Sequence, residues 1–402
     1  MPWSSGGAAC LPSLPTEAAL RPINITPRYT RTQHPQNWAF SCLRSMPANL
    51  AKFGAAIAVG LGGYAAWAWY SGGGGGGGGA KKQQQRKRAL EGDGYISLRL
   101  VSRTDISHDT RLLRFALPSP EHILGLPAGQ HVSVRSVGDK VAGEKVVSRP
   151  YTPVSGDDLV GFVDFVIKVY FPHVHPRFPA GGAMSARFER LALGETLDFR
   201  GPKGHVTYEG GGAFRVGKGY KGPEKGARRS AAQRTVRAKH VGMVCGGSGV
   251  TPMLQVVEWA KLHDGGGGGG PSWALLAANQ TPADVLCREQ IEALEASWQP
   301  SSSQSSSSSS SSSSFRKWYT VDRLQGTEPG ARDEAAAAGT DVGGAPWAYG
   351  VGFVTEEMLR ARLPPAGPDT VILLCGPPPM IEFACMPALT ALGHKAENIL
   401  AF

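Results

Sequence analysis

Between residues 240 and 402, short apolar runs alternate with stretches of helical pattern, and this alternation constrains the fold more than any other feature of the sequence. The apolar runs cover residues 240–245, 273–278, 317–321 and 370–374. Strands that alternate with helices usually build a parallel sheet with helices on both faces. We therefore expect an α/β doubly wound parallel-sheet domain, whose ligand site lies beyond the carboxyl ends of its strands.

Glycine-rich or polar residues follow these runs. Residues 246–252 read Gly-Gly-Ser-Gly-Val-Thr-Pro and precede a helical pattern over residues 253–262, and residues 375–380 read Cys-Gly-Pro-Pro-Pro-Met. A glycine turn between a strand and a helix lets the backbone approach a phosphate, which the helix dipole favours. The first turn is not the dinucleotide fingerprint GxGxxG, because Pro252 stands three positions after Gly249. By itself it only suggests a nucleotide site.

The part of the chain before residue 240 has a different sequence pattern, with short β-rich runs separated by turns. These runs cover residues 95–101, 112–117, 131–137, 161–170 and 196–200. Several short strands at this spacing predict a small antiparallel β-barrel.

Two segments of this β-domain could together hold a phosphorylated aromatic cofactor. The Arg149 guanidinium can form two parallel hydrogen bonds to a phosphate. Tyr151 offers a flat aromatic ring, and Thr152 offers a hydroxyl group. Glycines at 181–182 precede a helix that we expect at Met184, and free backbone N–H groups there would suit a second phosphate. Each feature alone is also typical of an ordinary β-surface or of a turn.

Three segments, 149–153, 162–171 and 178–185, resemble in order and spacing the flavin-binding domain of the NADH-cytochrome b5 reductase family, within the ferredoxin-NADP reductase superfamily. The resemblance implies FAD, with Arg149 on its pyrophosphate, Tyr151 against the isoalloxazine and Thr152 near flavin N5. The other residues that it assigns to FAD are Pro150, Val166, Lys168, Tyr170, Phe171, Gly182, Met184 and Ser185. Lys168 is also expected to meet the incoming nicotinamide cofactor.

The resemblance covers most of residues 94–402 and implies NADH as the second cofactor. It places Thr251 at the flavin, Gly247 and Gln280 beside NADH, and Asp322 at the adenosine ribose. The segment that would flank the nicotinamide comprises Cys375, Gly376, Pro377 and Met380. A carboxylate at the ribose accepts a hydrogen bond from a free 2′-hydroxyl and repels a 2′-phosphate, which favours NADH over NADPH.

The resemblance implies an enzyme that takes hydride from NADH onto FAD and passes single electrons to two molecules of cytochrome b5 or a similar acidic haem protein. Its catalytic residues would be Thr152, Lys168, Thr251 and Cys375. A thiol like Cys375 is typical of a buried core, and hydride transfer needs no cysteine nucleophile, so we expect it to position the nicotinamide. The alternatives are a ferredoxin-NADP reductase, a nitrate reductase flavin module, or a membrane-tethered scaffold without catalysis.

No haem-ligand or iron–sulfur motif is present, so the acceptor is expected to be a separate protein. The six cysteines form no CxxC pair, which argues against a structural zinc site and a disulfide scaffold. A turn before Pro176 explains His173 and His175 better than a metal site does. We predict no bound metal and a monomer.

The net charge of +10 belongs almost entirely to the beginning of the chain. Residues 1–90 carry ten Lys and Arg against one Glu, which leaves +1 for the other 312 residues. This distribution indicates a segment for organelle targeting and membrane anchoring rather than a nucleic-acid-binding surface. We expect a transit-like leader over residues 1–50, a membrane anchor over 51–71 and a linker over 72–93. A disordered tail, and an amphipathic or buried helix in place of the anchor, are the alternatives.

The anchor contains eighteen uncharged residues from Phe53 to Tyr70, just sufficient to span a thin bilayer. We expect a mitochondrial membrane, either the outer membrane or a membrane facing the intermembrane space; the alternative is the endoplasmic reticulum membrane, on its cytosolic face.

The remaining boundaries put an FAD-binding β-barrel at residues 94–212, a basic interdomain linker at 213–239 and an NADH-binding domain at 240–402. The linker has nine basic residues and one acid. It is either a solvated loop or a docking surface for an acidic haem protein. Residues 265–270, 305–314 and 325–346 are interpreted as loop expansions.

Overall fold

The computed structural model describes residues 86–136, 146–174, 178–224, 226–264, 270–298, 313–324 and 345–402. The predicted leader and anchor, and the linker up to residue 85, lie outside the described residues. Within the described part of the chain, no helix is both long and apolar enough to cross a bilayer.

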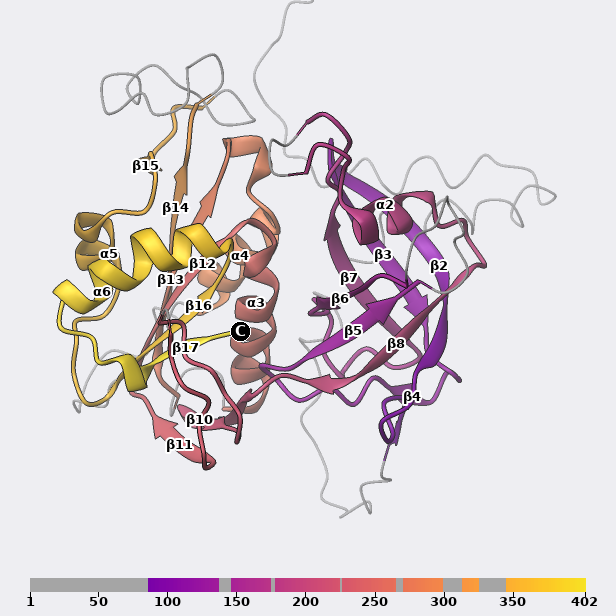
Figure 1. Cartoon of the computed structure of the whole chain (residues 1–402), viewed down its shortest axis with the longest axis horizontal. Helices are drawn as coiled ribbons and strands as arrows, with labels where there is room; N and C mark the ends of the chain where they lie inside the picture. The colour runs from indigo at the N-terminus through magenta and orange to yellow at the C-terminus, as the bar shows by residue number, and fades with distance from the viewer. Residues whose placement is uncertain are drawn as a thin grey trace, which may run out of the picture. The chain divides into compact units, whose positions relative to one another are not determined.

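The β-domain is built on one antiparallel sheet with the strand order β6-β5-β8-β2-β3-β7. Its strands are β2 (Ile96–Ser107), β3 (Thr110–Ala116), β5 (His131–Arg135), β6 (Ser148–Tyr151), β7 (Phe162–Lys168) and β8 (Thr196–Lys203) (Figure 1). The predicted antiparallel strands are therefore confirmed. No ladder joins β6 to β7 among the described residues, so the sheet is an incompletely closed barrel.

Alternation along the strands explains why this sheet encloses a core. Leu113 and Phe115 on β3 are fully buried and pack with Phe165 and Phe199 from β7 and β8. The helix α2 (Ala183–Arg190) packs on the same core, mainly through Phe188. On β7 nearly every residue is buried, because its second face packs against another core.

The α/β domain contains the predicted parallel sheet, in the order β15-β14-β13-β12-β16-β17 (Figure 1). Its strands are β12 (His240–Gly246), β13 (Ser272–Asn279), β14 (Phe315–Val321), β15 (Gly350–Val351), β16 (Thr370–Cys375) and β17 (Ile399–Ala401). The chain adds strands on one side of β12 and then returns to add β16 on the other. The strand order therefore reverses between β12 and β16, which is where such sheets bind ligands.

Helices cover both faces of this sheet. They are α3 (Val250–His263), α4 (Arg288–Trp298), α5 (Glu356–Arg362) and α6 (Met386–Ala391). Met243 on β12 packs with α3 and α4, whereas the next residue, Val244, packs with α5 and α6. Because both faces are buried, the strands read as continuous apolar runs in the sequence.

Two helix starts differ from the prediction. The sequence pattern predicts a helix over about residues 283–298, but a 3₁₀ turn, Pro282–Asp284, stands at its beginning, and α4 starts only at Arg288. The closing helix contains a π-helical segment, Met380–Cys385, before α6. Wide π turns often occur where a helix serves a functional site.

The interpretation of residues 213–239 as a solvated loop is wrong for much of the segment. β10 (Ala213–Val216) and β11 (Arg234–Arg237) pair with β9 (Val206–Gly210) in an antiparallel sheet. Phe214 and Val216 are fully buried, and Arg215 lies between them, half-buried. The many glycines and cations hid this short period-2 pattern in the sequence. A further pair of short parallel strands, β1 (Lys87–Arg88) and β4 (His122–Ile123), lies at the edge of the β-domain.

Candidate functional site

The arginine–tyrosine–threonine segment lies at the end of β6, next to α2. Pairing with β5 places Tyr151 opposite Val132, and Pro150 and Arg149 are exposed. The Tyr151 ring meets Phe188 of α2 edge to face, with centroids 5.0 Å apart. Burial raises the pKa of Tyr151, so its hydroxyl stays neutral. Thr152 follows, half-buried.

The start of α2 is tied to the residues that leave β7. Gly182 N–H donates to the Tyr170 carbonyl over 2.8 Å, and Tyr170 N–H donates to Ser185 Oγ over 3.2 Å. Ser185 Oγ in turn donates to the Gly182 carbonyl over 3.1 Å. A Cβ on Gly182 would collide with Ser185 Oγ, so a larger residue would have to turn the Ser185 hydroxyl out of these hydrogen bonds.

These contacts refine the predicted phosphate site. The Met184 side chain is buried in the core of the β-domain, and the Ser185 hydroxyl is already bonded to the backbone. Their contribution to an anion would therefore come from backbone N–H groups in the first turn of α2. No side chain caps that turn among the described residues. An uncapped helix start and an exposed Arg149 in the same domain fit a phosphate-bearing cofactor such as FAD.

The predicted flavin-side residues lie on one face of β7 and in the segment that follows it. Val166 and Lys168 lie on the face of β7 that turns away from the core of the β-domain, and Val166 joins the core of the α/β domain. Beyond the strand, the ring of Tyr170 packs on Phe178 with centroids 4.9 Å apart. Phe171 lies 5.9 Å from the Arg111 guanidinium.

At the reversal point, the loops after β12 and β16 touch through their backbones. A Cβ on Gly249 would lie 2.6 Å from the carbonyl carbon of Cys375, and one on Gly376 would lie 2.9 Å from Gly246 N. In contrast, Gly247 has φ +52° and no described heavy atom within 4 Å of the position of a Cβ. Gly247 thus opens onto free space beside the strand ends.

The structure brings the remaining nicotinamide candidates to this point. Pro377 and Met380 would meet a Cβ on Gly246 at 2.7 and 2.9 Å. Thr251, in the first turn of α3, is buried and donates to the Ser248 carbonyl over 3.1 Å. Burial raises the pKa of the half-buried Cys375 to about 12, so it is a neutral thiol. That state suits packing against a ring and not nucleophilic attack.

Gln280 and Asp322 follow β13 and β14 at the same edge. Asp322 N–H donates to the Asn279 carbonyl over 2.9 Å, and Asn279 Oδ1 is buried without a partner among the described residues. Burial, with a smaller contribution from the charge of Asp284, raises the pKa of Asp322 to about 6 against the opposing charge of Arg323. An unpaired amide oxygen and a carboxylate at one edge fit a ligand with hydroxyl donors such as a ribose.

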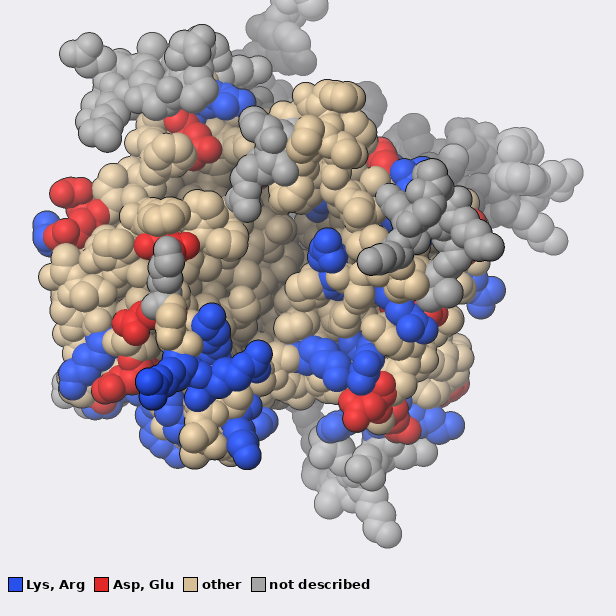
Figure 2. Space-filling view, in the orientation of Figure 1, with Lys and Arg blue, Asp and Glu red and all other residues tan. Residues whose placement is uncertain are grey.

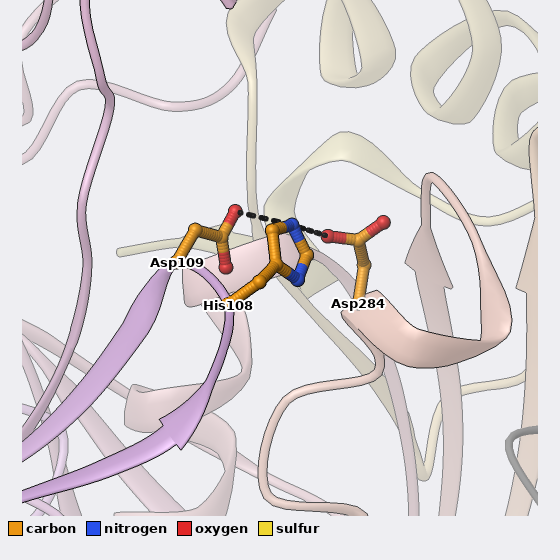
Figure 3. Close-up of side chains that lie close together, drawn as sticks. All are labelled: His108, Asp109 and Asp284. Atoms are coloured by element: carbon orange, nitrogen blue, oxygen red, sulfur yellow. Dashed lines mark ion pairs between the residues drawn. The ribbon is translucent and has the colours of Figure 1, made fainter. Parts of the chain in front are cut away.

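Lys168 forms ion pairs with two carboxylates of the protein. Its ammonium pairs with Asp109 and lies 3.0 Å from Asp284 Oδ1. His108, Asp109 and Asp284 cluster closely enough to hold a metal ion (Figure 3). The ammonium of Lys168 already supplies the positive charge there.

Sequence reasoning missed three further residues. Asp109 and Asp284 had no motif that could mark them. Phe353 is 74% exposed just after β15, and the preceding Gly352 N–H donates to the Val321 carbonyl over 2.8 Å, so Phe353 lies near Asp322. A phenylalanine between turn residues was the available signal, since exposed aromatic rings often stack on bases.

Comparison with known proteins agrees with this geometry. Residues 97–208 match the model of the oxidoreductase FAD-binding domain, and residues 243–339 and 319–386 match that of the oxidoreductase NAD-binding domain. NADH-cytochrome b5 reductase 3 of Rattus norvegicus is 45% identical over 76% of this chain and 85% of its own length. For NADH-cytochrome b5 reductase 2 of Xenopus tropicalis the identity is 40%, over 78% and 87%.

Among solved structures, the cytochrome b5 reductase domain of Ulva prolifera nitrate reductase superposes with a TM-score of 0.61 and 32% identity. The superposition covers 78% of this chain and 100% of that domain. The two cofactor domains, their order and this level of identity lead to one conclusion. The chain belongs to the NADH-cytochrome b5 reductase family.

Proposed function

We propose that this protein is an FAD-dependent oxidoreductase that takes hydride from NADH and passes single electrons to cytochrome b5. The proposal rests on one observation: the same chain contains two candidate cofactor sites. One consists of the uncapped start of α2 with the segment from Arg149 to Thr152. The other is the glycine turn at Gly247 against the segment that begins at Cys375. The family membership supports both cofactors.

When bound, FAD supplies the conversion between two-electron hydride chemistry and one-electron transfer. The role of the protein itself is to bind the two cofactors and to orient them toward each other. Backbone N–H groups of α2 and the Arg149 guanidinium would hold phosphates, and Tyr151 would pack against an aromatic ring. At the other site, Gly247 leaves room for the nicotinamide cofactor, and Asp322 would accept from a ribose hydroxyl. Proximity and orientation account for most of the acceleration in such a reaction.

Purification of the full-length chain tests this proposal directly. We expect a yellow protein that oxidises NADH with ferricyanide and reduces two molecules of ferricytochrome b5 for each NADH. A colourless protein that leaves NADH unoxidised would support the non-catalytic scaffold instead. A preference for NADPH, with ferredoxin as the better acceptor, would identify the ferredoxin-NADP reductase alternative.

We further propose that the basic segment around β10 and β11 docks the acidic haem protein. Lys and Arg side chains gather over this part of the molecule (Figure 2). The exposed cations are Lys218, Lys221, Arg228, Arg229, Arg237 and Lys239. Charge complementarity mainly accelerates association and makes it dependent on salt.

Reversal of charge at Arg228 and Arg229 provides the test. We expect slower reduction of cytochrome b5 with a flatter salt dependence, and unchanged reduction of a neutral quinone. An equal loss of both activities would contradict the docking role.

We also propose that residues 51–71 anchor the protein in a mitochondrial membrane and that the folded part is a monomer. The cationic leader and the uncharged run that follows it support the anchor. A fluorescent fusion carrying only residues 1–90 should label mitochondria. Labelling of the endoplasmic reticulum would support the alternative membrane, and diffuse fluorescence would support a tail without an address. Light scattering on detergent-solubilised protein would measure the oligomeric state.

A further inference from the structure

One largely buried ion pair joins the two cofactor domains. Lys168 stands at the end of β7, and Asp284 stands in the 3₁₀ turn that follows β13. Their side chains are 13% and 8% exposed, with 3.0 Å between Lys168 Nζ and Asp284 Oδ1. The same ammonium pairs with Asp109, from the two-residue turn between β2 and β3. Each domain therefore supplies one carboxylate to a single lysine.

Both carboxylates are held in place by their own domains. Asp284 accepts a 2.7 Å hydrogen bond from Thr281 Oγ1, and its backbone N–H donates to the Thr281 carbonyl over 3.0 Å. Asp109 accepts from Thr110 Oγ1 over 2.9 Å. Burial opposes ionisation of Asp284, but the bond from Thr281 and the charge of Lys168 outweigh it and hold its pKa below the usual range. Asp284 is thus a fixed, ionised partner of Lys168.

The cluster brings two carboxylates against one ammonium. Figure 3 shows His108 between Asp109 and Asp284, with Nε2 at 3.5 and 3.8 Å from their oxygens. His108 is 65% exposed. Both carboxylates also contact the Lys168 ammonium. The positive charge of Lys168 is masked from any anion that approaches this edge.

The cluster lies at the edge where the dinucleotide would bind. Asp284 comes four residues after Gln280, beyond the carboxyl end of β13, and its charge contributes to the raised pKa of Asp322. A dinucleotide carries its pyrophosphate across this same edge in sheets of this type. An incoming phosphate and Asp284 would therefore compete for one ammonium.

We propose that Asp284 is a positioning residue that holds the Lys168 ammonium at the domain boundary, so that Lys168 exchanges Asp284 for a phosphate oxygen of the dinucleotide when NADH binds. The inference rests on the proposed NADH-binding function. It predicts that Asp284 weakens dinucleotide binding, which is the opposite of what a merely structural ion pair would do. No covalent step is involved: a phosphate oxygen replaces the Asp284 carboxylate as a partner of the Lys168 ammonium, and Asp284 keeps its hydrogen bond from Thr281.

Equilibrium binding of NAD⁺ to the oxidised, full-length flavoprotein tests the proposal through four variants. D284N removes one negative charge close to an anion site and should lower the Kd about three- to tenfold. K168M should raise it. In the K168M background, D284N should change the Kd less than about twofold, because the ammonium for which the two groups compete is absent. D284E keeps the charge and should retain the wild-type Kd.

The matched control is D369N, because Asp369 forms an exposed ion pair with Lys239 at the amino end of β16. It should leave the Kd unchanged. In steady-state assays, KM for NADH should fall in D284N without a rise in kcat. Weaker or unchanged binding in D284N would overturn the proposal.

If D284N does not fold with its flavin, D109N removes the second masking carboxylate and carries the same predicted sign. Absence of flavin or of NADH oxidation in the wild type would instead overturn the proposed function, so the two failures are distinguishable.

Discussion

A single methyl group at Gly249 should force apart the two strand ends on which the nicotinamide site is built. Gly249 has helical φ and ψ of −62° and −7°, so alanine fits the backbone without torsional strain. Its Cβ, however, would collide with the Cys375 carbonyl, 2.6 Å from the carbonyl carbon. The neighbour is backbone at the end of a central strand and cannot rotate away. G249A therefore tests the close approach of β12 and β16 alone.

The expected magnitude follows from the depth of that collision. Overpacking of a well-packed site costs about 1 to 3 kcal/mol, and a clash against backbone belongs at the upper end. In a large domain, about 1 kcal/mol lowers Tm by about 2 to 4 °C. At about 2 to 3 kcal/mol, G249A should therefore lower Tm by about 4 to 12 °C. Displacement of Cys375 and Gly376 should also raise KM for NADH.

Gly247 supplies the matched control two residues away. Its φ of +52° makes alanine strained by about 1 kcal/mol, but its Cβ would project into free space. G247A should therefore lower Tm by only about 2 to 4 °C. If that space is where NADH lies, the added methyl group should weaken NADH binding about tenfold or more, because a single misplaced methyl group in a fitted pocket costs about 1 to 3 kcal/mol.

Thermal unfolding followed by flavin fluorescence, together with KM for NADH in the ferricyanide assay, separates the two variants. G249A should be the less stable protein, and G247A should keep its flavin and lose NADH affinity. An unchanged Tm in G249A would refute the close backbone approach. An unchanged KM in G247A would show that the free space beside Gly247 is not the nucleotide position.

Three further predictions concern other parts of the site and its support. Because the pKa of Asp322 is raised to about 6, its carboxylate is ionised above that pH and protonated below it. The preference for NADH over NADPH, measured as the ratio of the two kcat/KM values, should therefore weaken from about pH 8 to about pH 5. D322N should remove this pH dependence. E189A takes one charge partner from Arg111, which is 8% exposed, and should lower stability by about 3 kcal/mol in urea unfolding; a loss below about 1 kcal/mol would mean that the pair behaves as a surface contact. Gln255 is buried, accepts from Gly129 N–H over 2.8 Å and donates to the Gln130 carbonyl over 3.2 Å, so Q255L should cost about 1 to 3 kcal/mol and release flavin at a lower temperature, and Q255E, which keeps the acceptor but loses the donor and buries a charge, should cost at least as much.

Periodicity in the sequence was sufficient to predict most strands. The continuous apolar runs of β12, β13 and β16 predicted a sheet buried on both faces, which Met243 and Val244 confirm by packing on opposite sides. The segment 213–239 was misread because glycines and cations dominate its composition. Its short strands are stabilised by Phe214 and Val216, whose partners lie elsewhere in the chain.

The same distinction applies to the site. Motifs marked the residues from Arg149 to Thr152 and from Cys375 to Met380 because the chemistry of phosphates and rings acts through short contiguous segments. No motif could mark Asp284, because its significance comes from an ammonium 116 residues away in the sequence.

The sequence by itself therefore determined the two-domain architecture and the glycine turns, and it predicted the segments that hold the cofactors, since these depend on local periodicity and on residues close together in the chain. Only the tertiary structure decided that the Met184 and Ser185 side chains are turned to internal contacts, that β10 and β11 form a sheet, and that Lys168 is shared between carboxylates of both domains. The physical reason is that burial and charge pairing depend on distances between groups, and folding sets these distances independently of the separation of the groups along the chain.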